Sequence, residues 1–224
     1  MSRERPDLAP LIDHALLDPH QGREAIIRCC DEARHFGFAG VCVASRWVGL
    51  ARERLPREGS GRGQACRVVS VVGFPFGAIP AAVKQAEAEA AAEAGADELD
   101  VVPDFGALAD GDDRAVLDEL AAICELDLPV KVIVEIGQLA PTALELLVEV
   151  SIDAGVQFLK SGSGFGPAVR PDQIARLRQL ARGRAAVKAS GGIADLEQAL
   201  ALVEAGASRL GTSRGVALVQ ALRS

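Results

Sequence analysis

Two lysines and an aspartate stand where short apolar segments of the chain end. Lys160 closes the segment VQFLK, Lys188 closes AAVK, and Asp100 closes DELD. An amine on an apolar strand loses hydration, which disfavours its charged form and lowers its pKa, and a second cation nearby lowers that pKa further. We therefore expect one lysine to act as a nucleophile beside the other, with Asp100 relaying protons across the mouth of the site. The competing interpretation is that each lysine pairs with a carboxylate or extends its amine to water.

Two glycine-rich segments indicate an anion site. ASGGIAD at Ala189–Asp195 and LGTSRG at Leu210–Gly215 place glycine and hydroxyl residues between a strand and the start of a helix. Backbone N–H groups at such junctions point at an anion, and the phosphate sites of barrel enzymes often lie in the loops after strands seven and eight. The same segments also fit tight turns without a ligand.

Three further polar residues have two interpretations each. Lys131 and Glu135 in VKVIVEIG share one parity of a strand and would point into a barrel, either as a buried ion pair or as part of a proton network, and the structural role is favoured. Asp13 in LIDHALL would orient water at the site or be a hydrogen-bonded core residue.

Short apolar runs alternate with Ala- and Leu-rich segments of helical period, which is the pattern of βα units around a parallel sheet. The predicted strands are Leu11–Leu16, Gly40–Val43, Val68–Phe74, Glu98–Val102, Val130–Ile136, Phe158–Ser161, Ala186–Ala189 and Arg209–Thr212. The predicted helices are Arg23–Phe36, Ser45–Leu55, Ala81–Ala94, Arg114–Glu125, Thr142–Ala154, Pro171–Ala181, Asp195–Ala205 and Val216–Leu222. The sequence thus predicts an α/β fold, a single (β/α)8 TIM barrel over residues 1–224, with its site at the carboxyl ends of the strands.

An internal echo supports this repeat. EAGADELD, DAGVQFLK and EAGASRLG each run from an acidic residue through Ala-Gly into a strand. Gly95, Gly155 and Gly206 fit the position just after a helix, where a left-handed backbone costs glycine little. The segment Arg57–Gln64, REGSGRGQ, is predicted to be an exposed loop.

The composition narrows the class of partner. The 224 residues are 49% hydrophobic and 25% charged, with a formal net charge of −7 and a pI near 5.1. An acidic protein repels nucleic acid and membrane surfaces, so we expect a small molecule as partner and neither nucleic acid nor membrane. Five cysteines without a CxxC pair indicate neither a disulfide framework nor a zinc site. The start MSRERPDLAP lacks an apolar stretch of signal-peptide length, so a cytoplasmic protein is expected.

Along nearly its whole length the chain resembles the deoxyribose-phosphate aldolases. LIDHALL is similar to the family's IDHTLL, GVCVAS to VCVNP, VVGFPFG to VGFPxG, ADELDVV to GAxEIDxV and FLKSGSGF to FxKTSTGF, while VKASGGI is identical and RLGTSRG is close to RIGTSxG. The motifs also follow one another in the family's order, which makes the series far more specific than any single motif.

The resemblance implies a class I aldolase that reversibly cleaves 2-deoxy-D-ribose 5-phosphate to acetaldehyde and D-glyceraldehyde 3-phosphate, without a metal or organic cofactor. Lys160 would form the Schiff base with the acetaldehyde unit, Lys188 would perturb the pKa of that amine, and Asp100 would join Lys188 and a water in proton transfer. It also implies a dimer or larger homo-oligomer. The residues implied to meet the phosphate are Gly164, Gly191, Gly192, Gly211 and Ser213.

Several substitutions relative to the family motifs fall near the substrate. Ala15 replaces Thr, Ala44 replaces Asn, and Gly162 replaces Ser, so each removes a hydrogen-bonding side chain. Ala194 stands where some members carry Arg, and we expect the loss of that arginine to weaken phosphate binding. We hypothesise that Arg214, in the neighbouring loop, restores the missing cation.

Three rival functions remain open from the sequence. A related lysine aldolase with a changed acceptor aldehyde would keep Lys160, Lys188 and Asp100. A non-catalytic phosphosugar-binding barrel would keep the glycine loops, although retention of both lysines speaks against it. A phosphate-binding isomerase or epimerase would use Glu135 or Asp100 as a base, without a covalent lysine.

Overall fold

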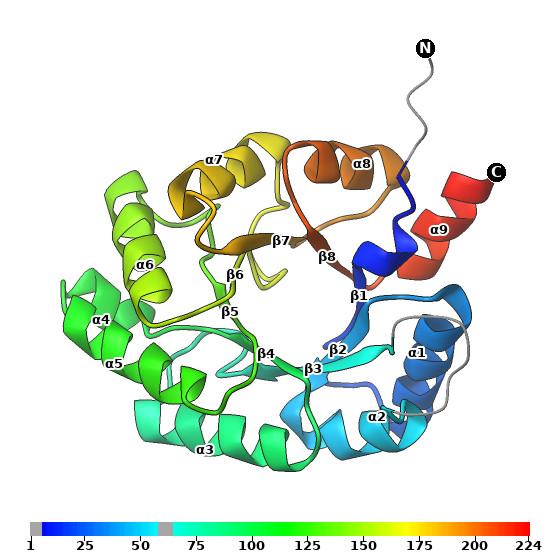
Figure 1. The fold of residues 1–224 in the computed structure, drawn as a ribbon, viewed down its shortest axis with the longest axis horizontal. Coiled ribbons are helices and arrows are strands. Elements are labelled where there is room, and N and C mark those ends of the chain that lie inside the picture. Colours follow the sequence, from blue (N-terminus) through cyan, green and yellow to red (C-terminus); the bar gives the residue numbers. More distant parts are fainter. Residues whose placement is uncertain (1–5, 58–64) are drawn as a thin grey trace.

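Eight parallel strands close into one barrel, in which each strand pairs with the next and β8 pairs with β1 (Figure 1). The structure is a computed structural model that describes residues 6–57 and 65–224. The strands are β1 (Ile12–Leu16), β2 (Gly40–Ala44), β3 (Arg67–Val72), β4 (Glu98–Val101), β5 (Val130–Ile133), β6 (Phe158–Lys160), β7 (Ala186–Ser190) and β8 (Arg209–Thr212). The predicted (β/α)8 barrel is confirmed.

Helices surround the strands as an outer ring (Figure 1). They are α1 (Arg23–Phe36), α2 (Val48–Arg54), α3 (Ala81–Glu93), α4 (Phe105–Ala109), α5 (Asp113–Cys124), α6 (Pro141–Asp153), α7 (Pro171–Ala181), α8 (Leu196–Glu204) and α9 (Gly215–Arg223), with 3₁₀ turns η1 (Ala9–Leu11) and η2 (Ser45–Trp47). Within the two described stretches of chain, none of these helices is long and apolar enough to cross a membrane.

Residues on the two faces of the strands form two buried regions, one between the barrel and the helices and one inside the barrel. The outward-facing residues pack against the helices in the main apolar core, which includes Val41, Leu99 and Val132. Inside the barrel, a smaller apolar cluster of Cys42, Val69 and Val71 comes from β2 and β3. The other six strands each contribute buried charged side chains to the inside, so the part of the barrel interior lined by β2 and β3 is apolar and the remainder is ionic.

Local sequence signals set the ends of several elements. Asp195 caps α8 by accepting a hydrogen bond from the backbone N–H of Gln198, and Pro171 occupies the first turn of α7. Gly95, Gly155 and Gly206 have φ values of +102°, +94° and +114° at their helix-to-strand junctions, as predicted.

The structure corrects some predicted boundaries. The predicted strand Val130–Ile136 ends at Ile133, and Glu135 adopts a φ of +43° that breaks the alternation of side chains. The predicted strand Val68–Phe74 ends at Val72, because Gly73 turns the chain with a φ of +65°. The predicted helix Ser45–Leu55 is divided into η2 and α2, and α4 was not predicted. Of the predicted loop Arg57–Gln64, residues 58–64 lie outside the described residues.

Candidate active site

Lys160, Lys188 and Asp100 meet inside the barrel. β4, β6 and β7 carry them, and Lys160 lies directly beside Lys188 in the pairing of β6 with β7. Asp100 Oδ2 accepts hydrogen bonds from Lys160 Nζ at 2.9 Å and from Lys188 Nζ at 2.8 Å. The exposed fractions are 3% for Lys160 and 0% for Lys188 and Asp100. The three residues singled out in the sequence therefore form one buried cluster.

The charges in this cluster hold one another in place. Burial alone would raise the pKa of Asp100, but the positive charges of Lys131, Lys160 and Lys188 hold that pKa well below its usual range. Burial alone would lower the pKa of Lys188, but the carboxylates of Asp100 and Asp13 outweigh it and raise the pKa above that of an ordinary lysine. Asp100 is therefore an anion and Lys188 a cation at neutral pH.

Asp13 and Lys131 extend the cluster. Asp13 Oδ2 accepts from Lys188 Nζ at 2.5 Å, and Lys131 Nζ donates to Asp100 Oδ1 at 2.8 Å. Burial would raise the pKa of Asp13, but Lys188, Lys131 and Arg209 lower it to about 2. Of the two interpretations offered for Asp13, its contacts support a partnered interior residue.

Glu135 does not pair with Lys131. Because β5 has ended before it, its carboxylate lies over the β6–α7 loop, where Oε1 accepts from the backbone N–H of Ser163 at 2.5 Å and Oε2 accepts from Gln138 at 3.3 Å. Lys131 instead contacts Glu98 at 2.6 Å and Asp100. The suggested Lys131–Glu135 ion pair is thus wrong.

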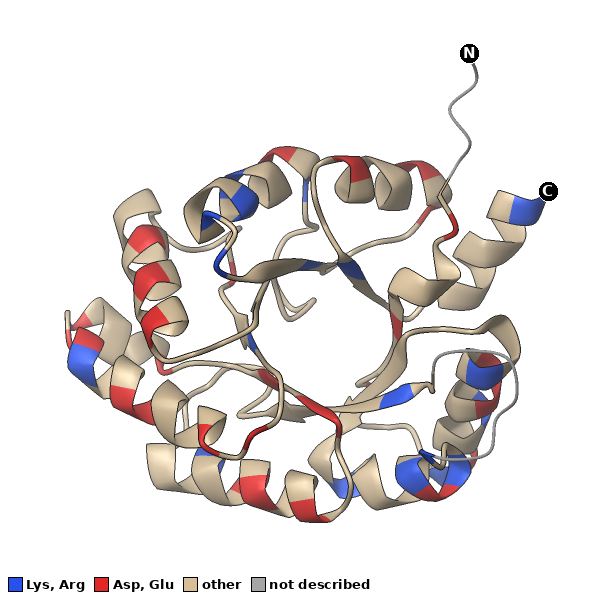
Figure 2. Cartoon of the chain, viewed as in Figure 1, with Lys and Arg blue, Asp and Glu red and all other residues tan. Residues whose placement is uncertain are grey.

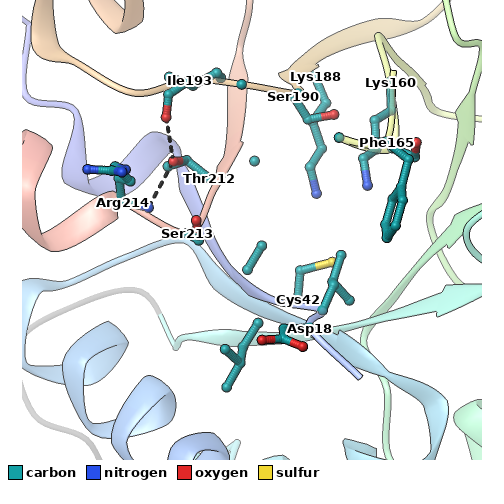
Figure 3. A pocket seen from close by; sticks show the side chains of 18 of the residues that line it. Asp18, Cys42, Lys160, Phe165, Lys188, Ser190, Ile193, Thr212, Ser213 and Arg214 are labelled. Carbon is teal, nitrogen blue, oxygen red and sulfur yellow. Dashed lines mark hydrogen bonds between the residues drawn. The ribbon is translucent and has the colours of Figure 1, made fainter. Parts of the chain in front are cut away.

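The side chains of both lysines line a cavity of about 480 Å³ (Figure 3). Asp100 does not line it, so the aspartate lies behind the lysines rather than across the mouth. One wall is apolar and includes Leu17, Phe74 and Phe165. The glycine loops also line the cavity, and all six residues predicted to meet the phosphate are among its lining residues: Gly164, Gly191, Gly192, Gly211, Ser213 and Arg214.

Hydroxyl groups fix the glycine loops to one another. Thr212 Oγ1 donates to the carbonyl of Ile193 at 3.0 Å and accepts from the backbone N–H of Arg214 at 2.9 Å, which joins the β7–α8 and β8–α9 loops (Figure 3). Ser161 Oγ donates to the carbonyl of Ser190 at 2.8 Å and accepts from its N–H at 2.9 Å. The loops after β6, β7 and β8 are therefore held as one rigid wall.

Arg214 lies across the cavity from Lys160 and Phe165 (Figure 3). Its side chain is exposed, and it stands immediately before the first residue of α9. Glycine at position 211 has a steric reason, because a Cβ there would come within 3.0 Å of the Lys188 side chain. The cavity thus has the amines of Lys160 and Lys188 on one side and the β8–α9 loop with Arg214 on the other (Figure 3).

The substituted positions differ in their relation to the cavity. Ala15 and Ala194 line it, and neither offers a hydrogen-bonding group there. A Cβ at Gly162 would lie 3.4 Å from Glu135 Oε2, an ordinary contact, so glycine is not required by space at that position. Ala44 is half-buried and is not among the residues that line the cavity.

Sequence reasoning missed several residues of the site. Glu98 and Arg209 belong to the buried ionic cluster, and both share inward parity with predicted residues, since Glu98 is two positions before Asp100 and Arg209 is two before Gly211. Asp18, which lines the cavity, follows β1 after an apolar pair, and no pattern marks it. Among residues 6–57 and 65–224, no group of three or more His, Cys, Asp or Glu side chains is arranged to hold a metal ion.

The fold and the site define a (β/α)8-barrel enzyme with a lysine pair at the carboxyl ends of its strands. The chain is 44% identical over 215 residues to the deoxyribose-phosphate aldolase of Thermosynechococcus vestitus, covering 96% of each protein. It is 43% identical over 216 residues to the deoxyribose-phosphate aldolase of Thermus thermophilus, covering 95% of this chain and 96% of the relative. The chain belongs to the deoxyribose-phosphate aldolase family.

Solved structures agree with this assignment. The tetrameric deoxyribose phosphate aldolase of Aeropyrum pernix superimposes with a TM-score of 0.85 at 33% sequence identity, covering 97% of this chain and 91% of that one. No profile of a known protein family matches the chain.

Proposed function

We propose that the protein reversibly cleaves 2-deoxy-D-ribose 5-phosphate to D-glyceraldehyde 3-phosphate and acetaldehyde, through a Schiff base on Lys160. The observation that carries this proposal is the asymmetry of the two amines. Lys188 has carboxylate partners on both sides, Asp13 and Asp100, whereas among the described residues Lys160 Nζ donates only to Asp100. Of the two amines, Lys160 is the one with fewer carboxylate partners among these residues.

The first step is attack of the uncharged Lys160 amine on the aldehyde carbon of the open-chain sugar. Loss of water from the carbinolamine leaves a protonated imine, which can accept an electron pair. Lys188 remains protonated beside it, and a like charge next to an amine disfavours the protonated form of that amine. Asp100 keeps both side chains in place.

Cleavage then breaks the bond between C2 and C3 of the sugar. The C3 hydroxyl loses its proton to a water or basic group, the C3–O bond becomes a carbonyl, and the bonding pair moves to C2 to form an enamine on Lys160. Protonation of the enamine at C2 and hydrolysis release acetaldehyde and the free amine. Because its carboxyl holds no proton at neutral pH, Asp100 acts here by orienting Lys188 and water.

The proposed phosphate site is the part of the cavity lined by the glycine-containing loops after β6, β7 and β8. Gly191 and Gly192 have φ values of +103° and +68°, which turn the backbone between β7 and α8 toward the cavity. Arg214 supplies a cation across the cavity from Lys160. A substrate with an aldehyde at one end and a phosphate at the other fits this arrangement of charges.

The rival functions can be compared with this proposal through particular features of the site. A lysine aldolase with another acceptor is favoured over the remaining rivals, because Ala15 and Ala194 leave the cavity wall without hydrogen-bonding side chains at these points. An isomerase or epimerase is disfavoured, since Glu135 bonds to a loop N–H and Asp100 is shielded behind two lysines.

The proposal also covers the domain organisation, cofactors, partner, assembly and cellular location of the enzyme. Residues 1–224 act as one domain, the chemistry needs no metal or organic cofactor because an amine and its ionic partners supply it, and the partner is a small phosphorylated sugar. By analogy with the tetrameric relative, the chain forms a homo-oligomer. It works in the cytoplasm, because its start MSRERPDLAP lacks an apolar stretch of signal-peptide length. Its acidic charge disfavours nucleic acid and membranes as partners.

Cleavage of 2-deoxy-D-ribose 5-phosphate by the full chain tests the proposal. We expect equal amounts of acetaldehyde and glyceraldehyde 3-phosphate to appear, and Lys160→Met to lower kcat by at least about 10³-fold. Phosphate-free aldehydes offered as acceptors in the reverse direction separate the proposal from the altered-acceptor rival. Binding of the sugar phosphate without any cleavage would favour the non-catalytic barrel instead.

A further inference from the structure

Six charged side chains form a closed ring inside the barrel, which we call the interior ring. In order around the ring they are Arg209, Asp13, Lys188, Asp100, Lys131 and Glu98. Arg209 Nη1 closes it, contacting Asp13 Oδ1 at 2.7 Å and Glu98 Oε2 at 3.4 Å. Figure 2 shows the corresponding blue segments on β7 and β8 and red segments on β1 and β4, around the inside of the barrel.

The interior ring is neutral, and Lys160 lies outside it. Three cations alternate with three anions around the ring, whereas within the described part of the chain Lys160 is attached to the ring only through Asp100 Oδ2. With every group in its ordinary charged form, the ring and Lys160 together carry one surplus positive charge. The proton on Lys160 is the one whose loss removes this surplus and leaves every ring contact in place.

We infer that Arg209 and Glu98, through the charge of the interior ring, set the pH at which Lys160 becomes reactive. The inference rests on the proposed Schiff-base function of Lys160. Both residues are positioning residues, since they reach the reacting amine only through Asp13, Lys188, Lys131 and Asp100.

Burial makes the charges of these two residues effective at a distance. Arg209 is 8% exposed and Glu98 is 4% exposed, so little water screens them. The aromatic side chain of Phe158 lies beside Arg209 and Lys131, the two cations of the interior ring that contact Glu98. The centre of the phenyl group is 5.6 Å from Arg209 Cζ and 5.9 Å from Lys131 Nζ. Arg67 also contacts Glu98, at 3.2 Å, but its side chain is 31% exposed and reaches solvent.

The other titratable groups around Lys160 do not change the charge count near neutral pH. Burial and the neighbouring Asp100 raise the pKa of the Cys42 thiol to about 11, so it stays neutral. Glu135 is bonded to the loop after β6. Asp18 and Arg214 line the cavity from the loops after β1 and β8, where they are exposed to solvent.

The test is the acid limb of kcat/KM against pH for cleavage of 2-deoxy-D-ribose 5-phosphate, which reports the free enzyme. Arg209→Gln removes a positive charge, so Lys160 holds its proton more tightly and the limb moves up by about one pH unit. Glu98→Gln removes a negative charge, so the limb moves down by about as much. The double variant restores the net charge, and its limb returns to within about 0.3 pH units of the wild-type position.

Two controls separate charge from packing. Arg209→Lys keeps the charge and should keep the wild-type limb within about 0.3 pH units, while Arg67→Gln removes a water-exposed charge next to the same Glu98 and should move it as little. Equal shifts of both single variants in one direction, or no shift in either, would overturn the inference while leaving the proposed function intact. If one of the single variants does not fold, the double variant still tests the inference. An acid limb of the double variant that lies more than about half a pH unit from the wild-type limb would overturn the inference. A wild-type protein that cleaves nothing would overturn both.

Discussion

One carboxylate oxygen, Asp100 Oδ2, accepts hydrogen bonds from both strand-end lysines, yet the two amines are not equivalent. Lys188 also contacts Asp13, and its raised pKa keeps it charged. Lys160 contacts one carboxylate among residues 6–57 and 65–224, that of Asp100, and it lines the cavity. The proposed division of roles between nucleophile and fixed cation therefore depends on one additional carboxylate, Asp13. The sequence places Asp13 on the first strand but does not show which lysine it contacts.

At the same scale, Arg214 is the cation proposed to replace the arginine missing at position 194. Arg214→Ala should raise KM for 2-deoxy-D-ribose 5-phosphate about tenfold with little change in kcat, because a charge-assisted contact to phosphate is lost in both the ground state and the transition state. Steady-state kinetics measures this. 2-Deoxyribose without phosphate is the matched control, and its KM should not change. An unchanged KM for the phosphorylated sugar would remove Arg214 from the phosphate site.

At the scale of elements, the alternation of side chains along a strand explains which site residues could be predicted from the sequence. Asp100, Lys160 and Lys188 were found because each ends an apolar run, and parallel strands bring such ends together. Glu135 was misplaced because alternation was extended past Ile133, where a positive φ turns the chain. Arg209 was missed as an interior residue because a buried arginine is recognised only through its partners, Asp13 and Glu98, which lie 196 and 111 residues away in the chain.

Helices α3 and α5 carry a further buried ion pair, whose residues do not line the cavity. Lys84 Nζ contacts Glu119 Oε2 at 2.8 Å, and both side chains are almost fully buried. Lys84→Met should lower the free energy of unfolding by about 3–5 kcal/mol, because it leaves Glu119 buried without its cation. Burial already raises the pKa of Glu119, which shows how poorly water reaches it.

Urea denaturation measures this loss, and α5 provides the matched control. Arg114 and Asp118 form an exposed pair at 2.8 Å, with side-chain exposures of 76% and 58%. Arg114→Ala should change stability by no more than about 0.5 kcal/mol. Equal effects of the two substitutions would contradict the expectation that the buried Lys84–Glu119 pair matters more for stability than the exposed Arg114–Asp118 pair.

At the scale of the whole molecule, the buried ionisable groups give stability a plateau in pH. Asp13 has a pKa of about 2, below its ordinary 3.8, so its contribution is fully present above about pH 4 and is lost as the pH falls toward 2. Buried thiols act at the other end, since burial raises the pKa of Cys66 from 9.0 to about 12 and that of Cys30 to about 11. Their contribution is fully present below about pH 9 and is lost above it.

Lys188 adds to the alkaline loss. Its pKa lies above the ordinary 10.5, so unfolding releases a proton above that pH and becomes easier as the pH rises further. We expect urea midpoints to be flat between about pH 4 and 9 and to fall on both sides. A midpoint that kept rising above pH 10 would contradict the raised values for the thiols and Lys188.

The small number and the burial of the lysines allow the proposed Schiff base on Lys160 to be tested by chemical modification. The chain contains four lysines, Lys84, Lys131, Lys160 and Lys188, and all four are buried. Only Lys160 and Lys188 line the cavity. No exposed lysine competes for an aldehyde reagent, so a modified lysine identifies the reacting amine with little background.

The most direct test is mass spectrometry after borohydride reduction of the full chain with acetaldehyde, beside Lys160→Met and Lys188→Met. The account predicts an ethyl group on Lys160 in the wild type, none on any lysine in Lys160→Met, and a reduced yield on Lys160 in Lys188→Met. An ethyl group on Lys188, or no adduct on the wild-type lysines, would contradict a Schiff base at Lys160.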